Sequence, residues 1–181
     1  ALSNANYKLP EAVESAFTIA SKTGVVVTIT ENSGELVYNT KEQTVSGYTF
    51  GINDELGIYA ESDFAFSGNA TVSGTTVGEY AMELSAADFS NLNTNYADVE
   101  FVVVDGKLTI TKAAEAPNKP AATIETRYVN TQLVELPADW RWNGYRNLDL
   151  GTNKDTAIYV GADAGNYNIE RAVVTITRLA C

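Results

Sequence analysis

Histidine is absent from this chain of 181 residues, and its single cysteine is the last residue, Cys181. Without His, no Ser–His or Cys–His nucleophile and no His-ligated metal can form within the chain. One Cys allows neither an internal disulfide framework nor a Cys-ligated zinc site. One Met against ten Tyr, in a chain rich in Thr and Val, is typical of β-strands and not of helices.

Long hydrophobic runs and an excess of positive charge are also missing. The apolar runs at residues 25–27 and 102–104 have the length of strands and are far too short to span a membrane. Twelve Lys and Arg against 23 Asp and Glu give a net charge of −11. Because such a field repels phosphate backbones, we expect no nucleic-acid partner and no membrane span in this segment.

Short sequence signatures recur along the chain. An Asn-Tyr pair occurs three times, at residues 6–7, 95–96 and 166–167. Each pair is followed by an alternating segment that ends in Thr-Ile, at residues 18–19, 109–110 and 175–176. This recurrence predicts the ends of three successive modules.

The recurrence and the prolines divide the chain. We predict terminal strands of a truncated preceding repeat at 1–22, a repeat at 23–113, a Pro-containing linker at 114–120 and a second, shorter repeat at 121–181. Phe17 and Ile19 alternate with polar or small residues, so a strand there has one apolar face that needs a partner. We expect it to dock on the following module or to pair with another chain.

Within residues 23–113 the hydrophobic period is two. Val25, Val27 and Ile29 predict a strand that faces a core on one side. Residues 31–34 read as a turn, and Asp105-Gly106 reads as a two-residue hairpin. The only helix-like stretch lies at residues 85–91, with Ser85 as N-cap and Asp88 at the capping-box position.

Many short strands separated by turn signals predict an all-β fold of tandem β-sandwich modules. The alternative is a β-grasp-like module, in which one short helix crosses a face of a single sheet. A helix longer than about 12 residues would contradict the sandwich.

The motifs at 37–48, 63–68, 76–80, 88–91 and 103–110 resemble the MBG-type and related Ig-like β-rich repeats of large bacterial surface proteins. The motifs at 136–142 and 159–167 are similar to another repeat of such stalks. These are signatures of turns and strands and carry no catalytic residues. The resemblance implies an extracellular, cell-wall-attached location within a longer secreted protein and a role as a spacer or adhesive segment.

Residues 139–146 are the strongest candidate for a binding site. Alternating aromatics beside Arg and Asn would let Trp140, Trp142 and Tyr145 stack on a sugar face. In a strand, however, the two Trp side chains point to the same face, and such a pair also makes a core. Both interpretations stay open at this point.

Other polar groups give weaker indications. Asn53, Asp54, Glu55, Glu61 and Asp63 supply oxygen atoms for calcium, but their spacing matches no calcium loop, and acidic turn residues explain them as well. No metal or cofactor is therefore expected. Three lysines on or beside strands would allow an isopeptide bond with Asn, although lysines at strand edges also discourage edge pairing: Lys41, Lys107 and Lys112.

The sequence thus predicts a non-catalytic structural or adhesive repeat segment that spaces or presents a distal binding domain. Its expected partners are neighbouring repeats of the same chain and host or bacterial surface glycans or proteins. The alternative is a carbohydrate-binding module that uses Trp140, Trp142 and Tyr145. An enzyme is not expected, because no general base with a pKa near neutrality is present apart from a perturbed carboxylate.

Overall fold

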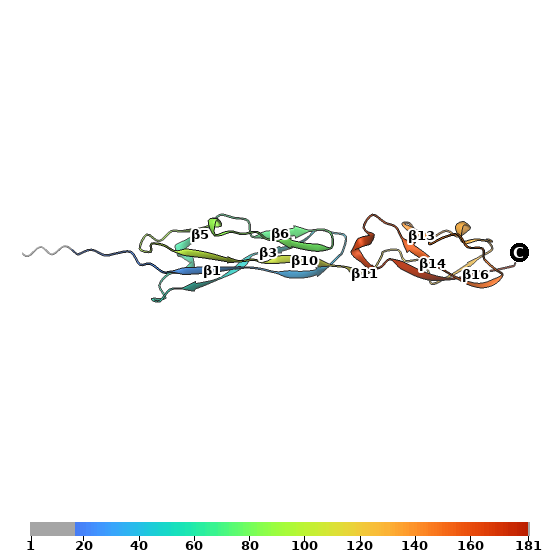
Figure 1. Cartoon of the computed structure of the whole chain (residues 1–181), viewed down its shortest axis with the longest axis horizontal. Coiled ribbons are helices and arrows are strands. Elements are labelled where there is room, and N and C mark those ends of the chain that lie inside the picture. The colour runs from blue at the N-terminus through green and yellow to red at the C-terminus, as the bar shows by residue number, and fades with distance from the viewer. Residues whose placement is uncertain (1–16, 181) are drawn as a thin grey trace, which may run out of the picture.

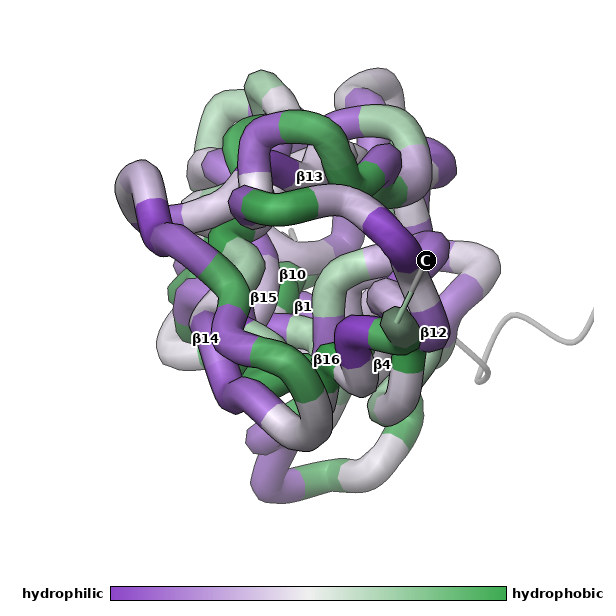
Figure 2. Tube along the Cα trace, turned by 90° about the vertical axis from the view of Figure 1, so that its right-hand side faces the viewer, coloured by the Kyte–Doolittle hydropathy of each residue, from purple (hydrophilic) through white to green (hydrophobic). Residues whose placement is uncertain are grey.

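The computed structural model describes residues 17–180. Two β-rich regions follow each other along one long axis, an N-terminal β region (residues 22–112) and a C-terminal β region (residues 113–180) (Figure 1). Seen along that axis, the two regions overlap, and β1 and β10 of the first lie in the middle of the view, among β13, β14 and β16 of the second (Figure 2). The molecule is therefore built as a rod of two parts placed end to end.

The strands of the N-terminal β region are β1 (Val26–Glu31), β2 (Gly34–Val37), β3 (Gln43–Ser46), β4 (Tyr48–Asn53), β5 (Phe64–Phe66), β6 (Thr71–Gly74), β7 (Gly78–Ala81), β8 (Phe89–Asn91), β9 (Glu100–Val104) and β10 (Lys107–Thr111). Those of the C-terminal β region are β11 (Ala113–Glu115), β12 (Thr123–Thr126), β13 (Trp140–Trp142), β14 (Gly151–Tyr159), β15 (Tyr167–Ile169) and β16 (Arg171–Arg178). The helical turns are η1 (Glu61–Asp63), η2 (Ala86–Asp88), η3 (Thr131–Leu133) and η4 (Ala164–Asn166).

All the helical segments within residues 17–180 are 3₁₀ turns of three residues. The predicted all-β, sandwich-like class is confirmed, because no helix in this range could cross a sheet as a β-grasp fold requires. The predicted cap is present, since the backbone N–H and the hydroxyl of Ser85 both donate to an Asp88 carboxylate oxygen, at 2.8 and 2.9 Å. A similar bond closes η1, where the backbone N–H of Ala60 donates to an Asp63 carboxylate oxygen at 2.9 Å.

The N-terminal β region is organised by two long chain segments that change sheets. β1 pairs with β9 in parallel and with β4 antiparallel, whereas β2 pairs with β10 in parallel and β10 pairs with β7 antiparallel. The first and last strands of the region therefore lie side by side along both sheets. The strand pairs β3–β6 and β5–β8 complete the region.

The two-residue hairpin predicted at residues 105–106 is wrong, whereas the break predicted at residues 31–34 does separate two strands. β1 does not pair with β2, and β9 does not pair with β10; at both places the chain passes from one sheet to the other. Gly106 allows this crossing because a Cβ there would lie 2.5 Å from the carbonyl oxygen of Asn32. The buried Glu31 carboxylate accepts the backbone N–H groups of Leu84 and Gly106, each at 2.6 Å.

The C-terminal β region repeats the parallel pairing of first and last strands. β11 pairs with β15 and β12 pairs with β16, both in parallel, and β16 continues to β14 and β13 in one antiparallel run. The expected spacer at 114–120 is not all free chain. Residues 113–115 form β11 and Ala116 is buried, so the second region begins before Pro117, the first proline of the predicted linker.

The core follows the predicted alternation. Val25, Val27 and Ile29 are fully buried in the first region, as are Val174 and Ile176 in the second. Aromatic rings extend the first core through edge-to-face contacts, including Phe64 against Phe101. No helix in the described part of the chain is long and apolar enough to cross a membrane.

The strand expected near Phe17 and Ile19 is not formed within residues 17–21. Both side chains are exposed, and the first pairing within the described residues is the parallel bridge from Lys22 to Tyr96. The remainder of the predicted 1–22 segment lies outside the described residues. Asn6 and Tyr7, and Cys181 at the other end, lie outside them too.

Candidate functional site

The predicted aromatic platform is split by the fold. Trp140 and Trp142 on β13 point inward and are only 6% and 7% exposed. Their indole N–H groups donate to the carbonyl oxygens of Pro117 and Val134, both at 2.9 Å. Tyr145 lies apart from them, exposed, with its hydroxyl donating to Asn147. As a sugar platform, the two Trp rings would first have to leave these buried positions.

A different cluster occupies the boundary between the two β regions. Asp163, which precedes η4, accepts hydrogen bonds from three tyrosine hydroxyls. Tyr159 donates at 2.8 Å, Tyr167 at 2.9 Å and Tyr38 at 3.1 Å. Tyr38 directly follows β2, so one of the three donors comes from the other β region.

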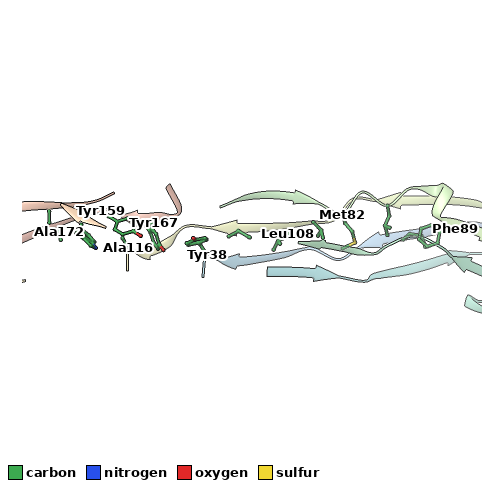
Figure 3. Close-up of a cluster of buried hydrophobic side chains, with 14 of the residues drawn as sticks. Tyr38, Met82, Phe89, Leu108, Ala116, Tyr159, Tyr167 and Ala172 are labelled. Carbon is green, nitrogen blue, oxygen red and sulfur yellow. The ribbon is translucent and has the colours of Figure 1, made fainter. Parts of the chain in front are cut away.

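Aromatic packing surrounds this carboxylate. Tyr38 meets Tyr167 edge to face with ring centroids 5.4 Å apart, and Tyr167 meets Tyr159 in the same way at 5.7 Å. Trp140 packs against Tyr159, with ring centroids 5.6 Å apart. All four side chains are buried, and Figure 3 shows Tyr38 facing Tyr167 in a row of buried residues that runs through both regions.

Further hydrogen bonds cross the same boundary. The side-chain oxygen of buried Asn166 accepts the backbone N–H of Val77, which precedes β7, at 2.8 Å. The Lys112 ammonium lies 3.5 Å from the carbonyl oxygen of Tyr167. We call the set of six residues with side-chain or backbone roles at this boundary the joint: Tyr38, Val77, Tyr159, Asp163, Asn166 and Tyr167.

The joint strongly perturbs its titrating groups. Burial alone would raise the pKa of Asp163, but the hydrogen bonds from Tyr159, Tyr167 and Tyr38 together outweigh it and lower that pKa below its ordinary value. Burial, the hydrogen bond to Asp163 and the charge of Asp163 raise the pKa of Tyr159 to about 12. The same three causes raise the pKa of Tyr167 and, less strongly, of Tyr38. The ionised carboxylate and the neutral phenols therefore favour each other.

We expect stability to fall between pH 10 and about 12. The unfolded chain loses tyrosine protons from pH 10 upward, whereas folded Tyr159 keeps its proton until about 12, so rising pH favours unfolding in this window. Denaturant unfolding followed at several alkaline pH values measures the slope. Tyr159→Phe removes one titrating proton and should flatten that slope; an unchanged slope in this variant would contradict the assignment.

Gly161 holds Tyr159 in place, and its replacement tests the geometry. A Cβ at residue 161 would lie 2.3 Å from the Tyr159 hydroxyl oxygen, so Gly161→Ala must push the phenol off Asp163. We expect a loss of about 1–2 kcal/mol in thermal or denaturant unfolding. Gly165→Ala is the matched control, because a Cβ there meets nothing within 4 Å. Equal losses in the two variants would contradict the role of Gly161.

Two of the acidic residues weighed as calcium ligands, Asp54 and Asp63, have other partners. Asp54 pairs with Lys22 and accepts the backbone N–H groups of Ile58 and Tyr59. The bond from Lys22, followed by those from the backbone, lowers the pKa of Asp54. Asp63 accepts the N–H of Ala60 and the side-chain amide of Asn93. Within residues 17–180, no three acidic, Cys or His side chains gather as a metal site would require.

The lysines weighed for an isopeptide bond lie in ordinary surroundings. Lys107 pairs with Glu79 on the surface, and Lys112 lies beside the joint. Lys41 is exposed, with its backbone N–H bonded to Asn39.

Sequence reasoning did not identify the joint. Tyr38 and Asp163 are 125 residues apart in the chain, and no local pattern connects them. Two of its residues, however, form the third Asn-Tyr pair, Asn166-Tyr167. That recurrence was the available signal, and it marks the end of a β region that meets its neighbour.

Comparison with known proteins agrees with this architecture for the first region. Residues 25–112 match the family model described as MBG domain. No curated protein and no solved structure matches the chain significantly. The matched residues begin at buried Val25, which directly precedes β1, and end one residue after β10, so they cover all ten strands of the N-terminal β region. Residues 25–112 are therefore the part of this chain that is similar to the MBG domain family, and they are called the MBG domain from here on.

Proposed function

We propose that this chain is a non-catalytic structural segment of a bacterial surface protein, which holds successive β modules in line and so spaces or presents a distal binding domain. The observation that carries the proposal is the joint. Three hydroxyls on one carboxylate, with rings from both β regions packed around it, resist bending at the boundary between the regions.

The connection between the regions supports the same function. β10 ends at Thr111 and β11 begins at Ala113, so only Lys112 separates a strand of one region from a strand of the next. A flexible linker needs several residues that are free of pairing. Because a single residue joins the two strands, the connection is too short to act as a flexible linker, and it keeps the two regions in line.

The MBG domain supports the proposed location, because repeats of this type occur in bacterial surface proteins. We place the chain outside the cell, as part of a longer wall-attached protein. Its proposed partners are neighbouring modules of the same chain, together with surface glycans or proteins. A net charge of −11 keeps such a rod soluble and turns nucleic acids away.

Small-angle X-ray scattering of the full chain tests the proposal. We expect the wild type to scatter as one extended rod, and a double variant with Tyr38→Ala and Asp163→Ala to give a broader distribution of shorter distances. Tyr145→Ala, an exposed tyrosine away from the joint, is the control and should scatter as the wild type does. A wild type that already shows the broad distribution would contradict a spacer.

Assays for hydrolysis test the non-catalytic part of the proposal. We expect the purified chain to cleave neither polysaccharides nor peptides. Cleavage that is lost on changing a single acid, such as Asp63 or Asp139, would overturn it.

A further inference from the structure

The end of the MBG domain that lies farthest from the joint carries a similar arrangement. Tyr59 and Tyr96 meet edge to face with centroids 5.1 Å apart, as Tyr159 and Tyr167 do in the joint. The Tyr96 hydroxyl lies 3.5 Å from a carboxylate oxygen of Asp54, whose side chain is almost fully buried. Each pair of rings therefore stands beside a carboxylate at the same end of its β region.

The backbone register is also the same at the two places. Lys22 pairs in parallel with Tyr96, and Ala113 pairs in parallel with Tyr167. Ile19 lies three residues before Lys22, and Ile110 lies three residues before Ala113. Ile110 is 1% exposed in the core of the preceding module, whereas Ile19 is 84% exposed. Ile19 thus corresponds in position to a core residue in the last strand of a module, but among the described residues no core surrounds it.

The surface beside Ile19 is apolar. Leu56 and Ile58 are 64% and 65% exposed, and with Ile19 they line a cleft of about 350 Å³ next to Tyr96. In the joint, the face around Tyr167 is covered by the preceding region through Tyr38. At the far end of the MBG domain Tyr96 is buried against Tyr59, but within the described residues no other β region covers Leu56 and Ile58 beside it.

We propose that this face is the receiving half of a second joint, and that its occupant is the distal tip of another β module whose last strand includes Ile19. The inference rests on the proposed function, because it extends the same end-to-end contact to a further module. Since Asp54 is already paired with Lys22, the tip needs no cation of its own. It offers apolar and aromatic side chains to Leu56, Ile58 and the Tyr96 ring.

A tandem of two copies of the chain tests the inference. Ile176 is the fully buried last-strand isoleucine of the C-terminal β region and corresponds to Ile19. Residue 176 of the first copy is therefore joined directly to residue 20 of the second. We expect the Lys22 and Ala97 amides of the second copy, which bond across the entering chain, to exchange hydrogen about tenfold more slowly than in the single chain.

A one-residue shift provides the matched control. When residue 176 is followed by residue 21, every side chain of the connecting strand turns to the opposite face, and the protection should disappear. Leu56→Ser with Ile58→Ser should remove the protection in the in-register tandem and leave the single chain unchanged. Equal exchange in the in-register and shifted tandems would overturn the proposal.

Two further outcomes are informative. Concentration-dependent association of the single chain through Leu56 and Ile58 would show that the occupant is a second copy in trans, and would also overturn the proposal. The joint at Asp163 is intact in every tandem. Failure here therefore leaves the proposed function standing, whereas failure of the scattering experiment removes the basis of both.

Discussion

Replacing Glu31 by Ala is expected to lower the free energy of unfolding of the MBG domain by about 2–6 kcal/mol, because two buried N–H donors lose their acceptor. Glu31 is 3% exposed, and its carboxylate accepts the backbone N–H groups of Leu84 and Gly106 at 2.6 Å each. These bonds lie where β1–β2 and β9–β10 pass from one sheet to the other. Small domains are stable by only about 5–15 kcal/mol, so this loss is large.

Chemical denaturation of the full chain measures the effect. Glu35→Ala, an exposed glutamate on β2, is the matched control and should change stability little. Glu31→Gln keeps one acceptor oxygen and should fall between the wild type and Glu31→Ala. A loss in Glu31→Ala no larger than in Glu35→Ala would show that the crossing does not depend on this carboxylate.

Replacing Asp163 by Ala is expected to lower the free energy of unfolding of the C-terminal β region by about 2–4 kcal/mol, since three phenol hydroxyls lose one shared, charged acceptor. The effect should depend on pH. The pKa of Asp163 is lowered in the folded state, so its contribution is complete above the ordinary carboxyl pKa and is lost as the pH falls through the folded-state value. Wild type and Asp163→Ala should therefore approach each other in stability in strong acid.

The control for this variant is Asp149→Ala, an exposed aspartate of the same region. Asp163→Asn keeps one acceptor and should lose less than Asp163→Ala. Equal stabilities of Asp163→Ala and Asp149→Ala at neutral pH would contradict the joint as described. So would a difference between wild type and Asp163→Ala that stays constant down to strong acid.

Local patterns in the sequence predicted the strands and their buried faces well. The alternation of Val25, Val27 and Ile29 places all three in the core, because a strand turns successive side chains to opposite faces. The same patterns failed at residues 105–106, where they predicted a hairpin and the chain instead crosses to another sheet. A short polar break looks alike whether the chain turns back or crosses to another sheet, and only the distant partners, such as Glu31 for Gly106, decide which occurs.

The site was less predictable than the fold. The size and spacing of Trp140 and Trp142 favoured a binding platform, yet both indoles are buried, one bonded to Pro117 in the connecting segment and the other to Val134. The joint unites Tyr38 with residues more than a hundred positions later, and a single sequence carries no signal for such a contact. Only the recurring Asn-Tyr pair indicated that residues 166–167 have a repeated structural task.

Residual dipolar couplings of the aligned full chain test the central claim, the fixed end-to-end orientation of the two β regions, most directly. We predict that couplings from residues 25–112 and 121–178 fit one common alignment tensor in the wild type, because the joint holds the regions as one body. In the double variant with Tyr38→Ala and Asp163→Ala, the two sets should require tensors of different magnitude. Two different tensors in the wild type itself would contradict the account.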